Sequence, residues 1–212
     1  MKISVFGKSV KGKDHQINED ALLTDKKKNL FVVADGVTIP HGGKEAAVRS
    51  CKYLQKFFKG DLRECFQKIN DRILKDAMKN VVGCTTLTAV HLDGNLLKVA
   101  NVGDSPCYIA NGEKIFRMTG NDRIFGTASL SQAIGQENIS VHYSEEKVGV
   151  GSYIVIASDG VTDMMSKDEM FALIKKHKIP RNIVSVVLKK IEERPTIYND
   201  DKTIIILQLK EN

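Results

Sequence analysis

The spacing of hydrophobic positions near the N-terminus predicts strands. Short apolar segments with strand-like length occupy Lys2–Phe6, Ala21–Thr24 and Asn29–Ala34. The third segment is apolar at nearly every position, which is typical of a strand buried on both faces. The chain therefore begins as a β-structure.

The period then changes to that of helices. Between Gly43 and Lys59 the apolar residues recur every three or four positions and share one face. A second amphipathic helix follows, with Asp61 as its N-cap and with Leu62, Cys65, Phe66, Ile69, Ile73 and Ala77 on its apolar side. Cysteines on such faces are typical of small buried thiols.

Two hairpins are predicted by turn dipeptides between strand-like segments. Asp93-Gly94 separates Thr85–Leu92 from Asn95–Val102, and Asn111-Gly112 separates Cys107–Ala110 from Glu113–Met118. A weakly patterned segment, 119–136, follows them.

The remaining elements complete one domain, residues 1–212. We expect strands at Ile139–Tyr143, Ser152–Ala157 and Thr203–Leu209. Two helices should begin after Ser166, which forms a capping box with Glu169, and at Pro180. This order predicts an α/β (α+β) sandwich with antiparallel sheets inside and helix pairs outside.

The amino-acid composition argues against several classes of protein. Of 212 residues, 42% are hydrophobic and 27% charged, as in ordinary soluble proteins. The sequence shows neither a membrane-spanning stretch nor a signal-peptide pattern, so we expect a cytoplasmic protein without a membrane partner. The formal net charge of +6 comes without aromatic residues between its basic clusters, which argues against a nucleic-acid partner. The four cysteines form no CxxC pair, which argues against zinc.

Acidic residues gather at the ends of the apolar segments. The four segments concerned are Asn18-Glu19-Asp20, Ala34-Asp35-Gly36, Ser158-Asp159-Gly160 and Asn199-Asp200-Asp201. Each alone is explained as a turn, but together they indicate converging carboxylates, which require a counter-ion to remain charged. Carboxylate oxygens suit Mg²⁺ or Mn²⁺.

The order of several motifs resembles a known family. The segments NEDA, ADG, GCTTLTAV, VANVGDSPCYI, IASDGVTD and NDDKTIIIL are similar, in the same order, to those of the metal-dependent protein phosphatases, the type 2C serine/threonine phosphatases. The resemblance covers residues 18–209. It implies a four-layer α-β-β-α sandwich and hydrolysis of phosphoserine or phosphothreonine by a metal-bridged water, with two or three Mn²⁺ or Mg²⁺ ions.

The resemblance also implies roles for individual residues. Asp35 would bridge two ions, one of which the Gly36 carbonyl would also bind, and Asp20 would orient the attacking water. The further implied metal ligands are Glu19, Asp159 and Asp200, with Asp104 and Asp163 joining Asp159 around a third ion. Asp201 is interpreted as a turn residue, because Asp200 stands three positions before Thr203 as the family's ligand does.

The chain departs from the family pattern in four places. His15 stands where the family usually has a phosphate-binding Arg, so we expect weaker phosphate binding that improves when the imidazole is protonated, although an exposed loop His explains it equally. The loop after Asp35, DGVTIPHGGKEAA, is longer than the compact form common in bacterial members, and His41 within it is a candidate general acid. The short segment 119–136 predicts an open site. Pro106 replaces an Arg near Asp104, and Arg123 is a candidate replacement for that charge.

Three interpretations remain open for the function. The first is an Mn²⁺/Mg²⁺-dependent phosphoprotein phosphatase, monomeric, with phosphoprotein substrates and a cognate Ser/Thr kinase as partners. A variant of it is a stress- or sporulation-type regulatory phosphatase that acts on one small phosphoprotein. The third is a catalytically inactive scaffold that binds phosphoproteins, for which His15 is the main support.

Overall fold

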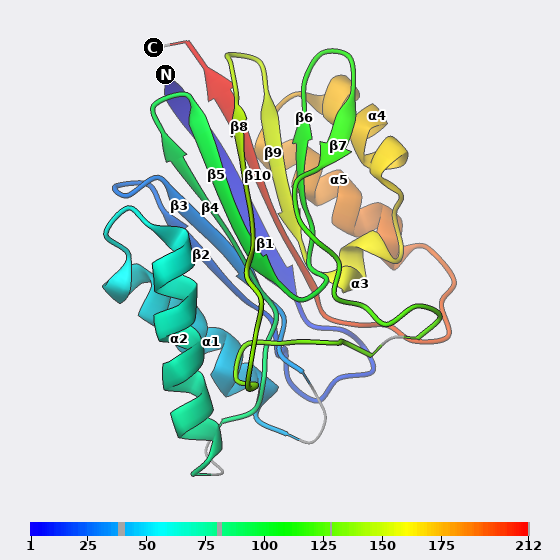
Figure 1. Ribbon diagram of the computed structural model, residues 1–212. Helices are drawn as coiled ribbons and strands as arrows, with labels where there is room; N and C mark the ends of the chain where they lie inside the picture. The colour runs from blue at the N-terminus through cyan, green and yellow to red at the C-terminus, as the bar shows by residue number, and fades with distance from the viewer. Residues whose placement is uncertain (38–40, 80–81, 128, 212) are drawn as a thin grey trace.

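Two antiparallel sheets of five strands each form the centre of the molecule (Figure 1). The computed structural model describes residues 1–37, 41–79, 82–127 and 129–211. In spatial order, the first sheet contains β1 (Lys2–Val10), β10 (Lys202–Lys210), β9 (Tyr153–Ala157), β6 (Cys107–Ala110) and β7 (Ile115–Arg117). The second contains β2 (Ala21–Asp25), β3 (Leu30–Ala34), β4 (Leu87–Asp93), β5 (Leu96–Val102) and β8 (His142–Lys147).

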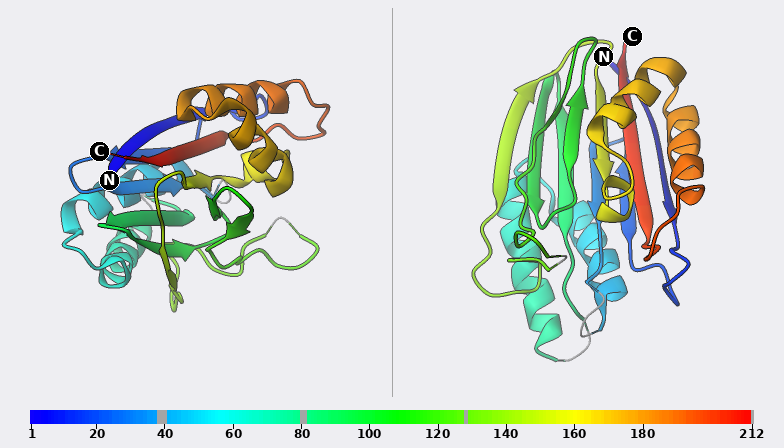
Figure 2. Two further views of the ribbon diagram at one scale, coloured as in Figure 1. Left: turned by 90° about the horizontal axis from the view of Figure 1, so that it is seen from above. Right: turned by 90° about the vertical axis from the view of Figure 1, so that its right-hand side faces the viewer.

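A pair of helices covers the outer face of each sheet. The pair α1 (Gly43–Phe57) and α2 (Leu62–Ala77) packs on the second sheet, and the pair α4 (Lys167–His177) and α5 (Pro180–Glu192) packs on the first. Figure 2 shows the resulting succession of helices, sheet, sheet and helices. A short helix, α3 (Asp159–Thr162), follows β9. The predicted four-layer sandwich is confirmed.

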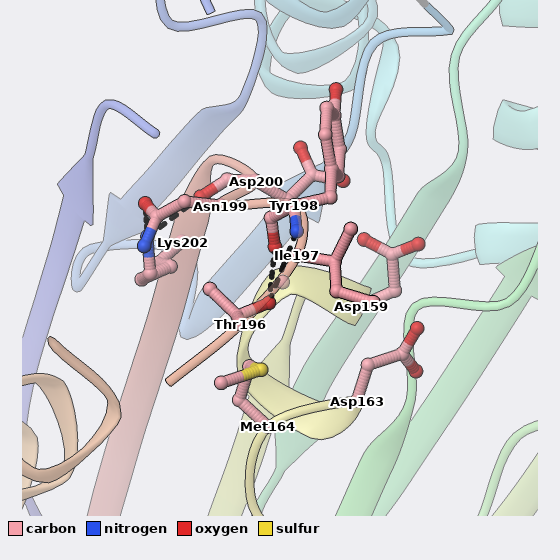
Figure 3. Close-up of a pocket in the computed structure, with 10 residues that line it drawn as sticks. Asp159, Asp163, Met164, Thr196, Ile197, Tyr198, Asn199, Asp200 and Lys202 are labelled. Atoms are coloured by element: carbon pink, nitrogen blue, oxygen red, sulfur yellow. Dashed lines mark hydrogen bonds between the residues drawn. The ribbon is translucent and has the colours of Figure 1, made fainter. Parts of the chain in front are cut away.

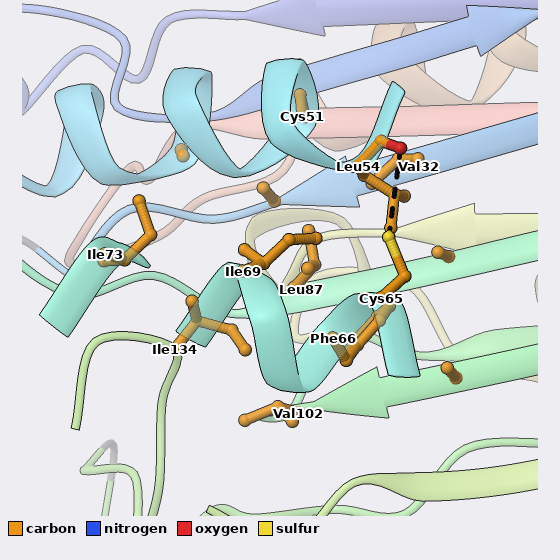
Figure 4. Close-up of a cluster of buried hydrophobic side chains, with 14 of the residues drawn as sticks. Val32, Cys51, Leu54, Cys65, Phe66, Ile69, Ile73, Leu87, Val102 and Ile134 are labelled. Carbon is orange, nitrogen blue, oxygen red and sulfur yellow. Dashed lines mark hydrogen bonds between the residues drawn. The ribbon is translucent and has the colours of Figure 1, made fainter. Parts of the chain in front are cut away.

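Successive side chains of the central strands point to opposite faces of their sheet, and the molecule therefore has three hydrophobic cores. In β3, Leu30 and Val32 face α1 and α2, whereas Phe31 and Val33 face the other sheet. The continuously apolar sequence of β3 is thus explained by burial on both faces, and complete burial of each such side chain contributes about 1.5–3 kcal/mol. Figure 4 shows the core beneath α1 and α2, where the Cys65 thiol donates to the carbonyl of Leu54 at 3.9 Å.

The helix ends follow the predicted chemistry. The Asp61 side chain accepts from the backbone N–H of Glu64, and Ser166 forms the capping box with Glu169. Gly42 precedes α1 with φ +82°, and a Cβ there would lie 2.5 Å from the backbone nitrogen of Gly83. Only glycine fits this close approach.

Two elements differ from the sequence predictions. The edge strand β8 spans His142–Lys147, not Ile139–Tyr143, because its pairing with β5 continues through residues whose side chains face solvent. The segment after β9 is a helical turn, α3, where the sequence had suggested only an Asp-Gly turn.

Candidate functional site

The acidic segments meet at one end of the sandwich, the lower end in Figure 1. In the second sheet Ala21 pairs with Ala34, so the residues before β2 and after β3 leave the sheet together. In the first sheet Ile204 pairs with Ala157, so the residues before β10 and after β9 also leave together. Strand register therefore brings segments from distant parts of the chain to one place.

One pocket of about 530 Å³ collects most of the predicted metal ligands. Asp35 and Gly36 follow β3, Asp104 follows β5, Asp159 begins α3 and Asp200 precedes β10, and all five line this pocket. Four carboxylates from four separate parts of the chain thus share one pocket.

The carboxylates at the centre of the site, Asp20, Asp35, Asp159 and Asp200, form what we call the inner cluster. Burial, followed by the negative charges of the surrounding carboxylates, raises the pKa of Asp35 well above its ordinary value. Burial raises the pKa of Asp20 to about 7, and burial together with the charge of Asp104 raises that of Asp159 to about 6. Crowded carboxylates of this kind are stable as anions only beside a cation.

The residues present fit divalent cations. Asp20 is 2% exposed, and its Oδ1 has no hydrogen-bond partner within the described part of the chain. Its Oδ2 accepts from the Ser158 hydroxyl at 2.9 Å, and that hydroxyl in turn accepts from the backbone N–H of Thr203. An all-oxygen donor set with one oriented but unpartnered carboxylate oxygen suits Mg²⁺ or Mn²⁺.

Glu19 and Gly36 approach each other at the start of α1. A Glu19 carboxylate oxygen accepts from the backbone N–H of Lys44 at 3.3 Å, and the Lys44 ammonium donates to the carbonyl of Asp20 at 2.8 Å. A Cβ at Gly36 would lie 2.4 Å from the carbonyl carbon of Gly43 and 2.8 Å from the Glu19 carbonyl oxygen. The absence of a side chain at position 36 allows these segments to meet.

Asp201 has a role that the sequence interpretation missed. Its buried carboxylate accepts from the backbone N–H groups of Gly12 and Glu19 at 2.7 Å each, and contacts His15 Nδ1 at 2.8 Å. It therefore ties the segment after β1 to the segment before β10, which is more than a turn requires. The paired acidic residues Asp200 and Asp201 are a signal that one of them has a positioning role.

The His15 side chain is largely covered, at 9% exposed, although its neighbours Asp14 and Gln16 in the same loop are exposed. Its Nε2 contacts the Tyr198 hydroxyl and lies 3.3 Å from Asp200 Oδ1, so both ring nitrogens have partners. Burial alone would lower the pKa of His15, but the hydrogen bond to Asp201 and the nearby negative charges raise it. Within the described chain, His15, Asp200 and Asp201 also form a compact group of potential metal ligands. Phosphate binding by His15 stays a prediction, and it requires the ring to exchange one partner.

A second group of carboxylates, Asp104, Asp159 and Asp163, forms what we call the outer cluster, and Arg123 joins them. The guanidinium donates to Asp104 at 2.9 Å, to Asp159 at 2.7 Å and to Asp163 at 2.8 Å. The sequence indicates that Arg123 supplies a positive charge here, but it does not indicate where the side chain points. In the structure the Arg123 side chain points toward all three carboxylates.

The residues described after position 128 in the short segment 119–136 form part of the pocket wall. Arg123 and Leu130 form an antiparallel bridge, and Ser129, Leu130, Ala133 and Gln136 line the pocket beside Asp35. His41 lies in the loop before α1 and is exposed, and its role as a general acid stays a prediction.

A neighbouring pocket of about 370 Å³ lies between α3 and the segment before β10 (Figure 3). Asp159 and Asp163, one helical turn apart, direct their carboxylates to the same side of α3. Ile197 and Tyr198, also in its lining, are largely exposed.

None of the helices in the described ranges is long and apolar enough to cross a membrane.

Sequence comparison identifies relatives across almost the whole chain. The family model described as Stage II sporulation protein E (SpoIIE) matches residues 25–210. A curated relative, probable protein phosphatase 2C 17 of Arabidopsis thaliana, is 24% identical over 256 residues, which cover 95% of this chain and 87% of the relative.

Solved structures share the fold over the full length. PppA, described as a regulatory component of a type VI secretion system in Pseudomonas aeruginosa, has a TM-score of 0.88 at 20% identity and covers 98% of both chains. The catalytic domain of the serine/threonine phosphatase PstP, solved with two manganese ions, has a TM-score of 0.81 at 19% identity and covers 99% of both chains.

Proposed function

The chain belongs to the family of Stage II sporulation protein E (SpoIIE), and from this premise we propose that it is a PP2C-type phosphatase that hydrolyses phosphoserine and phosphothreonine in proteins with the help of Mn²⁺ or Mg²⁺. The observation that carries the proposal is the shared pocket of Asp35, Asp104, Asp159 and Asp200. Of these, Asp35 and Asp200 lie there without a lysine or arginine partner among the described residues, and burying carboxylates without a cation is costly.

The inner cluster would hold two ions. Asp35, the Gly36 carbonyl, Asp159 and Asp200, which line the same pocket, would hold them, and Glu19 would bind through water. When bound, such ions supply an activated water as nucleophile and neutralise the charge of the phosphoryl group.

The protein's own residues would orient the reactants. Asp20 is held by Ser158 through Oδ2, and its buried Oδ1, which has no partner in the described chain, would accept a hydrogen bond from the attacking water. Asp201 fixes the backbone at Glu19 and therefore the approach of the Glu19 side chain. His15 is the candidate contact to the substrate phosphate, and His41 the candidate proton donor to the leaving alcohol.

Mn²⁺-dependent release of phosphate from a phosphothreonine peptide tests the proposal. We expect turnover that EDTA abolishes and that Asp35→Asn lowers by more than about 100-fold, the upper end of the cost of losing an outer-shell partner of a metal ligand. The matched control is Asp93→Asn, which changes an exposed carboxylate in a hairpin turn that asparagine also favours.

Two outcomes would contradict the proposal. One is a folded wild-type protein that releases no phosphate with either metal, and the other is full activity in Asp35→Asn. Absence of turnover with retained binding of the phosphopeptide would support the inactive scaffold.

A further inference from the structure

Arg123 occupies the centre of the outer cluster. Its Nε donates to Asp104, Nη2 donates to Asp159, and Nη1 donates to both oxygens of Asp163, at 2.7–3.1 Å, and Nη2 also lies 2.8 Å from Asp104 Oδ2. One planar guanidinium thus contacts all three carboxylates to which the family resemblance assigns a third ion. Its fork of donors matches carboxylates better than the compact ammonium of lysine does.

The backbone around Arg123 is fixed independently of these ion pairs. The buried Asp122 accepts from the backbone N–H of Gly103 at 2.8 Å and contacts His142 Nε2 at 2.7 Å. The Asp122 carbonyl accepts from the backbone N–H of Ser131 at 2.6 Å. The backbone at position 123 is therefore held beside the pocket, and the Arg123 side chain is long enough to reach the carboxylates from there.

A divalent ion and the guanidinium cannot occupy this position together. A cation with carboxylate ligands requires oxygen atoms at about 2.0–2.6 Å, in the space where the Arg123 nitrogens now lie. Both carry positive charge, so a nearby ion would also repel the guanidinium. Occupation by one therefore excludes the other.

We propose that Arg123 is a built-in replacement for the third cation, so that this chain takes metal ions only at the inner cluster. Arg123 is then a positioning residue, because its Nη2 donates to Asp159, which is also assigned to the inner cluster. The inference rests on the proposed metal site but does not depend on turnover.

The number of Mn²⁺ ions bound per chain tests this inference, measured by equilibrium dialysis and by the electron paramagnetic resonance signal of free Mn²⁺. We expect Arg123→Ala to bind one more ion per chain than the wild type. The double variant Arg123→Ala/Asp163→Asn should return to the wild-type number, because the added ion loses a ligand.

Arg49→Ala is the matched control. Arg49 also pairs with two carboxylates, Glu45 and Asp76, but on α1 and α2 away from the pocket, so its loss should leave the number of ions unchanged. Circular dichroism establishes that each variant is folded.

The inference is overturned if folded Arg123→Ala binds no additional ion, or if the wild type already binds an ion that Asp163→Asn removes. A wild-type protein that binds no Mn²⁺ would contradict the proposed function instead. The gain of an ion in Arg123→Ala would still support the role of Arg123.

Discussion

The inner and outer clusters both concentrate negative charge, but the two differ in which positive groups lie beside that charge. Among the described residues, no lysine or arginine forms an ion pair with Asp20, Asp35 or Asp200. In the outer cluster, Arg123 is paired with every carboxylate. Under the proposed function the inner cluster, where among the described residues only His15 approaches the Asp200 carboxylate, would take its cations from solution, whereas the outer cluster already has the guanidinium of Arg123. Asp159 belongs to both and links them.

Metal addition should separate the two clusters most clearly. Each Mn²⁺ ion that binds at 100 times its dissociation constant adds about 2.7 kcal/mol to the free energy of unfolding. For a chain of this size that amounts to a rise of roughly 5–10 °C in melting temperature relative to the protein in EDTA. We expect Asp35→Asn to lose most of this rise and Asp163→Asn to keep it, as measured by thermal unfolding. Equal responses of the two variants would remove the distinction between the clusters.

Asp201 offers a second comparison, because it lies beside the inner cluster but is compensated by the protein. Asp201→Ala leaves the N–H groups of Gly12 and Glu19 without their acceptor, so we expect the free energy of unfolding to fall by about 1–3 kcal/mol. Asp201→Asn should cost less, since an amide oxygen still accepts. Urea unfolding in EDTA measures both, and wild-type stability of Asp201→Ala would contradict the positioning role.

The smallest effect is expected at the rim of the outer cluster. The Asp163 side chain is 55% exposed, and ion pairs at such positions contribute little to stability. Asp163→Asn should therefore change the free energy of unfolding by less than about 1 kcal/mol in urea unfolding experiments. A loss above about 2 kcal/mol would show that the guanidinium is held mainly from this side.

Most of the fold could be predicted because its elements have strong local signals. The continuously apolar β3, the two turn dipeptides and the Ser166 capping box determine structure over a few neighbouring residues. The edge strand β8 was misplaced since its second half, Ser144–Lys147, is polar and gains its strand conformation only by pairing with β5.

The candidate site was predictable in its residue types but not in its contacts. Acidic residues at strand ends are visible in the sequence, whereas the direction of a long side chain depends on what packs around it. Arg123 and Asp201 therefore required the structure: the first reaches three carboxylates, and the second contacts residues near the other end of the chain.

The position of β10 in the first sheet has a consequence for the order of assembly during synthesis. This strand lies between β1 and β9, so the first sheet cannot close until residues 202–210 have left the ribosome. The bond between Gly12 and Asp201 joins positions 189 residues apart, and such distant pairing slows folding. A nascent chain therefore carries an incomplete site until β10 is inserted, and it should gain metal binding only in the last step of folding.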